Sequence, residues 1–305
     1  MKKLSIFMLV AVLFVAFAFT ACGGNNAPQT SEPAATEAPA TEAPADEESP
    51  AATEEVAQEE FKVGMECAYP PYNWTQTDDS NGAVALESGQ YAGGYDVEVA
   101  KLIADGLGKK LVVVPTTWDG LIPALESGVI DAIIAGMSPT DERKESIDFT
   151  DSYYREDIVL GIVVKKGGAF EGATGFADFK DAKITAQLGT YHYDKIDQIE
   201  GVAKQEAMKD FTAMRVALAS GIIDGYVSEK PEGESAMNAD PDTYYFIEFA
   251  DGAGFDLSEG DTSIAVGIKK GNEDLVAAIN KALAGISEDD RKALMEAATA
   301  NQPAA

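Results

Sequence analysis

The stretch "WDGLIPALESGVIDAIIAGMSPTDER", residues 118–143, contains three elements in close succession. "WDGLIPALESG" has apolar residues at helical spacing, and Gly128 follows where a helix commonly ends. "IDAIIAGM" is a short continuous apolar run, typical of a buried strand. Ser138 and Pro139 favour the start of another helix, with Asp141 completing a variant capping box. A helix, a strand and a capped helix so close together predict an α/β fold.

The same alternation continues on both sides of this stretch. Apolar runs predict further strands, and segments with a 3.6-residue period predict helices. The predicted strands are 61–67, 110–116, 183–190, 222–229 and 262–271, and the predicted helices are 96–108, 191–199, 211–221 and 273–286. Strands and helices that alternate at this spacing favour a mostly parallel sheet, in which ligands bind at the strand ends.

The start of the chain has the pattern of an export signal. Two lysines precede an apolar run over 4–19, and small residues follow it, so we predict a signal peptide at 1–21. Cys22 directly after Ala21 resembles a bacterial lipobox, although Phe19 stands where that pattern usually has Leu. We therefore predict lipidation of Cys22, with plain secretion as the alternative. Several acyl chains on one cysteine would anchor the protein stably.

Residues 22–60 are predicted to form a disordered tether. From residue 25 onward they are mainly Ala, Pro, Thr and Glu, with no Lys or Arg. Such a composition cannot bury enough apolar surface to offset the entropy of ordering. The whole chain has 52 acidic residues against 23 basic ones, a net charge of -29. Nucleic acids and anionic lipid headgroups are poor partners for such a surface.

The remaining residues are enough for two lobes. Cys67 is the only cysteine besides Cys22, so no disulfide is predicted within the mature domain. One free cysteine and the single histidine, His192, make a transition-metal site a poor prediction, and no cofactor is predicted. His192 is interpreted as a polar residue in the first turn of a helix, without a functional role.

Arg143 is one of only four arginines, and it follows the predicted helix start. A guanidinium beside the N–H groups of Gly136 and Ser138 would suit a carboxylate, because its planar fork binds both oxygens. The alternative is a surface arginine paired with Asp141 or Glu145, which would contribute only about 0–1 kcal/mol. The residues alone leave both interpretations open.

Further candidates follow the other predicted strands. Aromatic side chains in loops could form flat walls for a ligand, or they could be core residues beneath a lid. Glu66 at a strand end is either a specificity residue or a solvated edge. In the second half, Gly189 and Thr190 open a strand-to-helix turn, and Glu229 ends a strand; a plain loop and a turn acid are the alternatives. The aromatic residues are Tyr69, Tyr72, Trp74 and Trp118.

Residues 119–154, "DGLIPALESGVIDAIIAGMSPTDERKESIDFTDSYY", strongly resemble family 3 of the extracellular solute-binding proteins of bacterial polar amino acid ABC transporters. The resemblance extends over about 61–290. It implies a two-lobed fold like that of the type II periplasmic binding proteins, with crossings near 153–157 and 260–264. Lobe 1 would then comprise 61–155 plus 263–305, and lobe 2 would comprise 156–262.

The resemblance also implies roles for the residues of lobe 1. The residue at the position of Arg143 binds the ligand α-carboxylate, while the Gly136 backbone and the Ser138 hydroxyl bind the carboxylate and the α-amino group. Tyr69 and Trp118 would sandwich the ligand side chain. Glu66 stands where basic amino acid binders and the glutamine binder carry an Asp that meets the distal end of that side chain, and it is one methylene longer.

In lobe 2, Glu229 stands at the position of an acid that pairs with the ligand α-ammonium, where the family more often has Asp. Gln187 aligns near another ligand-contact position. The backbone amides of Thr190 and Tyr191, at the start of a predicted helix, would give the carboxylate its remaining partners.

These residues predict binding of a free amino acid, arginine or lysine first and glutamine next. The lobes would close on it and deliver it to a membrane permease that works with a cytoplasmic ATPase. The protein would be an extracytoplasmic monomer, in contact with the cell membrane only through its lipid anchor. Alternatives are a cyclohexadienyl or arogenate dehydratase-like enzyme on the same fold, or a ligand-sensing module. We find no nucleophile–base pair, and therefore predict no enzymatic activity.

Overall fold

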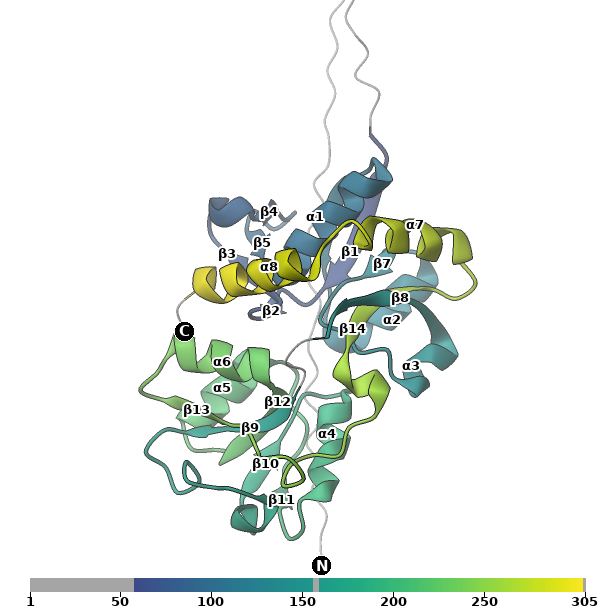
Figure 1. The fold of residues 1–305 in the computed structure, drawn as a ribbon. Helices are drawn as coiled ribbons and strands as arrows, with labels where there is room; N and C mark the ends of the chain where they lie inside the picture. The colour runs from purple at the N-terminus through teal and green to yellow at the C-terminus, as the bar shows by residue number, and fades with distance from the viewer. Residues whose placement is uncertain (1–57, 156–158, 304–305) are drawn as a thin grey trace, which may run out of the picture. The chain divides into compact units, whose positions relative to one another are not determined.

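Two five-stranded sheets organise the part of the chain that the computed structural model describes, residues 58–155 and 159–303 (Figure 1). The predicted signal peptide, Cys22 and nearly all of the predicted tether lie outside these residues. The described residues belong to one compact unit. Within them, no helix is long and apolar enough to cross a membrane.

In the first sheet, four strands run in the same direction and one runs antiparallel to them. Its spatial order is β6-β1-β7-β14-β8. Val63 of β1 pairs with Val113 of β6 on one side and Ala132 of β7 on the other, so β1 lies in the interior of the sheet. The strands are β1 (Glu60–Met65), β6 (Lys110–Pro115), β7 (Ala132–Ile133), β8 (Ile147–Tyr154) and β14 (Ile264–Lys269).

The second sheet has the order β11-β10-β12-β9-β13. β10 pairs in parallel with β11 and β12, while β9 runs antiparallel to β12 and β13. The strands are β9 (Leu160–Lys165), β10 (Lys183–Thr185), β11 (Ala203–Lys204), β12 (Gly225–Glu229) and β13 (Tyr244–Ile247).

The chain passes between the two sheets twice. It leaves the first sheet after β8 and enters the second at β9; residues 156–158 of this crossing lie outside the described residues. It returns between β13 and β14, through the short 3-10 helix Glu259–Thr262. The predicted α/β class with two lobes and two crossings is thereby confirmed. The residue boundaries of the lobes stay predictions. We use "first lobe" and "second lobe" for the elements around the first and second sheet.

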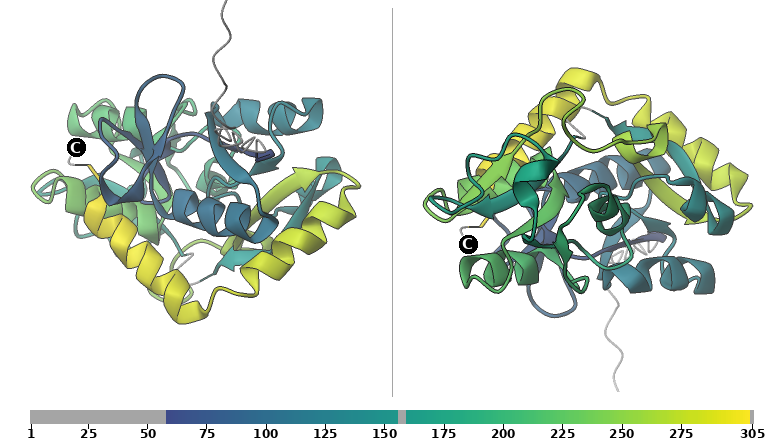
Figure 2. Two further views of the ribbon diagram at one scale, coloured as in Figure 1. Left: turned by 90° about the horizontal axis from the view of Figure 1, so that it is seen from above. Right: turned by 90° about the horizontal axis from the view of Figure 1, so that it is seen from below.

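Amphipathic helices cover the first sheet. α1 and α7 pack against each other and against β6 and β8, while α2 packs against β1 and β7 (Figures 1 and 2). Gly108 and Gly128 end α1 and α2 in the left-handed conformation, as glycine after a helix favours. The helices are α1 (Tyr95–Leu107), α2 (Leu121–Ser127), α7 (Glu273–Leu283) and α8 (Glu288–Asn301). α8 was not predicted.

A third, small sheet replaces the loop expected after β1. Its order is β2-β3-β5-β4, and Asn73 in β3 is fully buried. The Asn73 side chain accepts a hydrogen bond from the Cys67 backbone and donates one to Asp96, which ties the segment after Glu66 to α1. The strands are β2 (Ala68–Tyr69), β3 (Asn73–Gln76), β4 (Val84–Ala85) and β5 (Tyr91–Gly93).

Three helices pack on the second lobe. α4 (Tyr191–Lys195) and α5 (Phe211–Ala219) match the predicted helices, and the Asp210 side chain caps α5 by accepting from Ala213 N at 2.7 Å. α6 (Lys230–Ala239) begins directly after β12 and was missed. Its sequence contains Pro231 and Gly233, which count against a helix by propensity. Proline is nevertheless well tolerated in a first turn.

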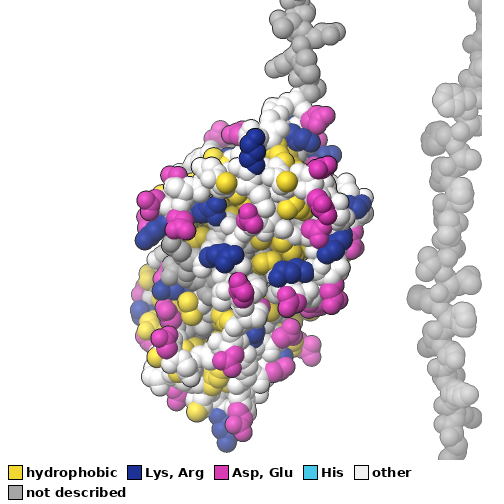
Figure 3. Space-filling view, turned by 45° about the vertical axis from the view of Figure 1, so that its right-hand side comes forward, with side chains coloured by type: hydrophobic (Ala, Val, Ile, Leu, Met, Phe, Trp, Pro, Cys, Tyr) yellow, Lys and Arg dark blue, Asp and Glu magenta, His cyan; other side chains and the backbone are white. Residues whose placement is uncertain are grey.

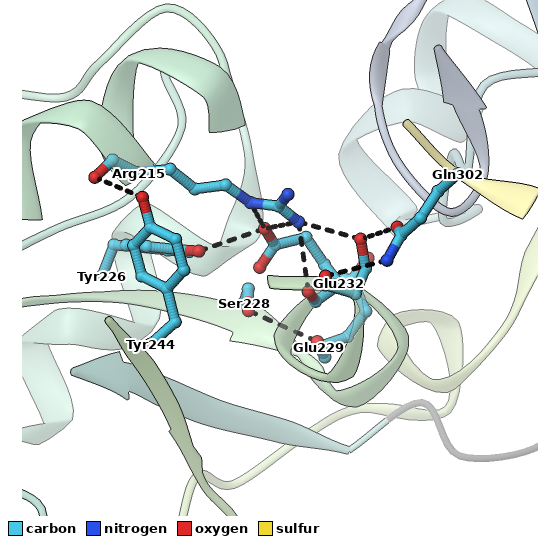
Figure 4. Close-up of polar contacts among 8 residues, drawn as sticks. Arg215, Tyr226, Ser228, Glu229, Glu232, Tyr244 and Gln302 are labelled. Atoms are coloured by element: carbon cyan, nitrogen blue, oxygen red, sulfur yellow. Dashed lines mark hydrogen bonds and ion pairs between the residues drawn. The ribbon is translucent and has the colours of Figure 1, made fainter. Parts of the chain in front are cut away.

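A buried ion pair joins α5 to α6. The Arg215 guanidinium lies 2.9 Å from Glu232 Oε1 (Figure 4). Its Nη2 also donates to Ser235. Tyr226 adds a hydrogen bond to the same carboxylate at 3.1 Å. Gln302, just after α8, donates to the Ser235 backbone oxygen and so links the end of the chain to α6. On the face drawn in Figure 3, acidic and basic side chains are interspersed.

We predict that Glu232→Ala destabilises the protein by about 3–5 kcal/mol, because it leaves the Arg215 charge buried without a counterion. Chemical denaturation measures the change. Thr212→Ala, an exposed position on the same pair of helices, is the control and should change stability by less than about 0.5 kcal/mol. Equal stability of the two variants would contradict the importance of the pair.

Candidate functional site

One pocket collects most of the residues that the sequence singled out. It is narrow and is lined from both lobes. Nine of the ten predicted ligand-binding residues line it, and the tenth, Glu66, is hydrogen-bonded to one of the nine. The lining residues are Tyr69, Trp118, Gly136, Ser138, Arg143 and Ile264 from the first lobe, and Gln187, Thr190, Tyr191, His192 and Glu229 from the second.

The topology of the sheets explains this convergence. Glu66, Trp118 and Gly136 follow the carboxyl ends of β1, β6 and β7, which are parallel neighbours. Gln187 and Glu229 stand at the same ends of the parallel pair β10 and β12. Carboxyl ends of parallel strands meet at one edge of a sheet, so both lobes present their candidate residues along an edge.

The short helix α3 (Asp141–Ser146) places Arg143, but its start differs from the prediction. Thr140 is the N-cap residue, and its hydroxyl accepts from Arg143 N at 3.4 Å. The predicted capping box of Ser138 and Asp141 is therefore wrong: the helix begins two residues later. Ser138 stays in the loop, where its carbonyl oxygen accepts from Arg143 Nη1 at 2.9 Å.

The Arg143 guanidinium faces carbonyl oxygens and a ring. Besides Ser138 O, it donates to Gly189 O at 3.3 Å and lies 5.0 Å from the centre of the Trp118 ring. Within the described part of the chain it makes no ion pair with a carboxylate; Asp141 pairs with Lys144 instead. Burial lowers the Arg143 pKa to about 10, which still leaves it charged at neutral pH. A half-buried cation so placed is suited to an anion supplied from outside.

Aromatic rings form the adjoining wall. Trp118 Nε1 donates to Gly189 O of the second lobe at 3.0 Å. Tyr69 lines the pocket but stacks face to face on Phe211, with ring centres 4.4 Å apart and planes 8° apart. Tyr69 therefore already has an aromatic partner from the second lobe. Tyr72 and Trp74 do not line the pocket and are buried in the core.

Glu66 and Gln187 meet across the lobes. Gln187 Nε2 lies 2.9 and 3.0 Å from the two carboxylate oxygens of Glu66, and 3.1 Å from Lys209 O. Burial raises the Glu66 pKa to about 7, although the hydrogen bond from Gln187 opposes this shift. A cation bound near Glu66 would readily shift its carboxyl to the ionised form.

Glu229 and His192 form a second buried pair. His192 Nε2 lies 3.2 Å from Glu229 Oε2, and the side chains are only 7% and 4% exposed. Burial raises the Glu229 pKa to about 8 and lowers the His192 pKa to about 3. Among the described residues, Glu229 Oε2 and His192 Nδ1 are buried without a hydrogen-bond partner. Such unsatisfied atoms are costly and point to a ligand.

The floor of the pocket is tied to α1. Gly136 N donates to the Tyr153 hydroxyl at 3.2 Å, and this hydroxyl donates to Asp96 at 2.8 Å. The Gly136 N–H was expected to be free for a carboxylate, and this expectation is wrong because Tyr153 uses it. Burial raises the pKa of Asp96 to about 6.

Several residues at the pocket were missed from the sequence. His192 was given no role, and Phe211 and Ile264 were not considered. Tyr191 also donates its hydroxyl to Asp261 O, at 3.0 Å. Phe211 opens a helix and Ile264 opens a strand, and in both positions an apolar residue is most simply interpreted as core. No local pattern distinguishes them.

A larger groove lies between α6 and α8, and its lining includes Pro231 and Met295. Its charged residues, Glu234, Lys292 and Glu296, are all exposed, so water screens them. No group of acids, cysteines and histidine in the described residues could hold a metal ion. We therefore take the pocket around Arg143 as the functional site.

A two-lobed α/β fold with a cation and acids around the pocket between its lobes is that of a binding protein for small zwitterionic solutes. Residues 61–297 match the bacterial extracellular solute-binding proteins, family 3. The chain belongs to this family. The predicted resemblance is confirmed.

Curated relatives are binding proteins for amino acids. A probable histidine-binding protein of Campylobacter jejuni is 31% identical over 67% of this chain and 73% of the relative. The L-cystine-binding protein TcyJ of Escherichia coli is 32% identical over 74% of this chain and 77% of the relative.

Solved structures agree with the fold. An ancestral arginine-binding protein bound to arginine matches with a TM-score of 0.63 and 30% identity, over 78% of this chain and 96% of the other. The ancestral amino acid-binding protein AncCDT-1, a precursor of cyclohexadienyl dehydratase, matches with a TM-score of 0.62 and 29% identity, over 78% and 94%.

We predict that Gly136→Ala destabilises the protein and disturbs the pocket. Gly136 has φ of +61°, and a Cβ there would lie 2.8 Å from Tyr69 Cε1. Gly128→Ala is the matched control, because its φ is +77° and nothing lies within 4 Å of the added Cβ. The control should lower the free energy of unfolding by about 1–2 kcal/mol through its backbone conformation alone, and Gly136→Ala should lower it by more. Thermal unfolding of both variants measures the difference. Equal destabilisation would show that the Tyr69 ring moves away from the added Cβ at no cost in stability.

Proposed function

We propose that this protein is the extracytoplasmic substrate-binding component of an amino acid ABC importer, taking a free polar amino acid between its lobes and delivering it to a membrane permease. The observation that carries the proposal is Arg143, a half-buried cation at the pocket without a carboxylate partner in the described chain. A free amino acid brings the missing carboxylate.

The ligand would bind through both of its charged ends. Its carboxylate would lie on the Arg143 fork, with further N–H groups from Thr190 and Tyr191. Its ammonium would lie on Glu229. Because the Gly136 N–H donates to Tyr153, Gly136 would contribute its carbonyl oxygen, and Ser138 its hydroxyl.

The charges of the pocket favour a cationic or amide ligand. Arg143 carries one positive charge, while Glu66 and Glu229 can carry two negative ones. A zwitterion with a cationic side chain balances this set, and buried charges are tolerated only when they are balanced. With Glu66 protonated, a neutral amide such as glutamine balances it equally. We therefore propose arginine or lysine first and glutamine next, with Tyr69 and Trp118 against the side chain.

Closure of the lobes would complete the site. Arg143, Trp118 and Glu66 come from the first lobe, and each contacts the second lobe at Gly189 or Gln187. Only a closed arrangement brings both sets of groups onto one ligand, so ligand binding favours closure.

We propose that the protein is not an enzyme. Its curated relatives above are binding proteins, yet the match to a precursor of cyclohexadienyl dehydratase keeps that enzyme as the alternative. Such an enzyme needs an acid or base beside a leaving group. Turnover of arogenate or prephenate by the purified protein would establish the alternative. A sensing module is the other alternative, and the absence of permease and ATPase genes nearby would favour it.

We also propose a signal peptide over 1–21, lipidation of Cys22 and anchoring of a monomer to the cell membrane. The partners would be a permease and its cytoplasmic ATPase. Mass spectrometry of the mature N-terminal peptide tests the anchor. An unmodified Cys22 would indicate plain secretion instead of lipidation.

We predict that Arg143→Ala weakens amino acid binding at least about 100-fold, because it removes a bidentate charge-assisted contact. Calorimetric titration measures the affinity. Lys144→Ala is the matched control: this neighbouring cation is exposed and pairs with Asp141, so its loss should leave affinity within about twofold. Undiminished binding by Arg143→Ala would overturn the proposed carboxylate site.

A panel of free amino acids tests the substrate. We predict that arginine and lysine raise the melting temperature most and glutamine next, because each presents donors to Glu66. Stabilisation by glutamate or cystine, with none by arginine, lysine, histidine or glutamine, would show the substrate assignment to be wrong.

A further inference from the structure

Glu229, the acid proposed to bind the ligand ammonium, is already paired with His192. The relative exposures of the two residues are 5% and 3%, and both line the pocket. His192 Nε2 and Glu229 Oε2 are 3.2 Å apart. The inference drawn from this pair rests on the proposed function.

Within residues 58–155 and 159–303, no cation balances the charge of Glu229. The charged and titratable groups around the pair already have partners, and among the described residues none of the cations bonds to its carboxylate. Arg143 donates to Ser138 and Gly189, Lys195 pairs with Asp261, Arg215 pairs with Glu232, Tyr191 donates to Asp261 O, and Glu66 is bonded by Gln187.

Two bare acceptor atoms cannot remain stably 3.2 Å apart in a buried site, because their lone pairs repel; one of them must carry a hydrogen. A buried carboxylate without a cation is also costly. Glu229 Oε2 and His192 Nε2 lie 3.2 Å apart, yet as a carboxylate this oxygen has no hydrogen-bond partner. Protonation of Glu229 removes both penalties, because the carboxyl becomes neutral and its O–H supplies the missing hydrogen between the two atoms. Burial favours the uncharged form of each group, which agrees with a proton on the carboxyl and none added to the ring.

We propose that His192 is a positioning residue of the ammonium subsite. Its ring accepts a hydrogen bond from the protonated Glu229 carboxyl until the ammonium of an amino acid takes the place of that proton. Binding then releases one proton from Glu229 to solvent. The carboxylate holds the ammonium on one side and His192 on the other.

The ring must change its tautomer in this exchange. Before binding, Nε2 is the acceptor and the ring hydrogen is on Nδ1. Once Glu229 is a carboxylate, a lone pair on Nε2 would repel it, so the hydrogen moves to Nε2 by exchange with water. The ring stays neutral throughout and holds one hydrogen in both forms, so the only proton lost is that of Glu229.

This exchange makes affinity depend on pH. A proton bound to Glu229 before the ligand arrives must leave, so protons compete with the amino acid. The Glu229 pKa of about 8 sets the range. Release of the Glu229 proton alone should raise the dissociation constant up to about tenfold for each unit that the pH falls below 8. Glu66 would steepen this dependence for cationic ligands, but not for glutamine.

The chain's single histidine allows a direct test by ¹⁵N NMR of its imidazole. We expect the Nδ1–H tautomer without added amino acid, and the Nε2–H tautomer at saturating arginine. Titration calorimetry at pH 6.5, in two buffers with different heats of ionisation, should show release of at least about one proton per arginine bound. An unchanged tautomer or no proton release would overturn the inference. Failure of arginine, lysine and glutamine to bind at all would instead overturn the proposed function.

Variants of His192 test its role separately. Glutamine keeps one group that donates and one that accepts, whereas leucine keeps neither. We expect His192→Leu to raise the dissociation constant about 10- to 100-fold and to alter its pH profile, and His192→Gln to restore it to within about fivefold of the original. Asp194→Asn, exposed on the same helix, is the control, and thermal melts verify folding. Unchanged affinity and pH profile of a folded His192→Leu would overturn the inference.

Discussion

The structure depends at its centre on a half-buried guanidinium without a carboxylate of its own in the described chain. Arg143 is held by the Ser138 and Gly189 carbonyl oxygens and by the Trp118 ring. These partners orient the fork but do not neutralise it, because carbonyl dipoles and a ring face carry no net charge. The acids around the pocket balance that charge together with a bound ligand.

The site also carries two acids, Glu66 from the first lobe and Glu229 from the second, whose ionisation depends on what binds. Burial raises the pKa of Glu66 and of Glu229, so each can pass between neutral and charged near neutral pH. Gln187 and His192 are the side chains that contact them, and both can accommodate either form. The pocket can thus match its charge to a ligand by releasing protons.

Local patterns predicted much of the fold but misjudged specific elements. The helices at 96–108 and 211–221 were recognised because their apolar residues repeat at helical spacing. α6 was missed because Pro231 and Gly233 oppose helix by propensity, although a first-turn proline is tolerated and tertiary packing supplies the rest. Ser138 and Asp141 satisfied the capping rule in sequence, but Thr140 caps the helix because Ser138 is held against Arg143.

The sequence by itself determined the α/β class, the family and nearly all the residues around the pocket, because these follow from short-range periodicity and from a motif of contiguous residues. Only the tertiary structure decided which of them meet. The Phe211–Tyr69 stack, the Tyr153 bond to Gly136 and the His192–Glu229 pair each join residues far apart in the chain. The stack is made by the packing of one lobe on the other, and the other two contacts are made by packing within one lobe. No local sequence pattern encodes these pairings.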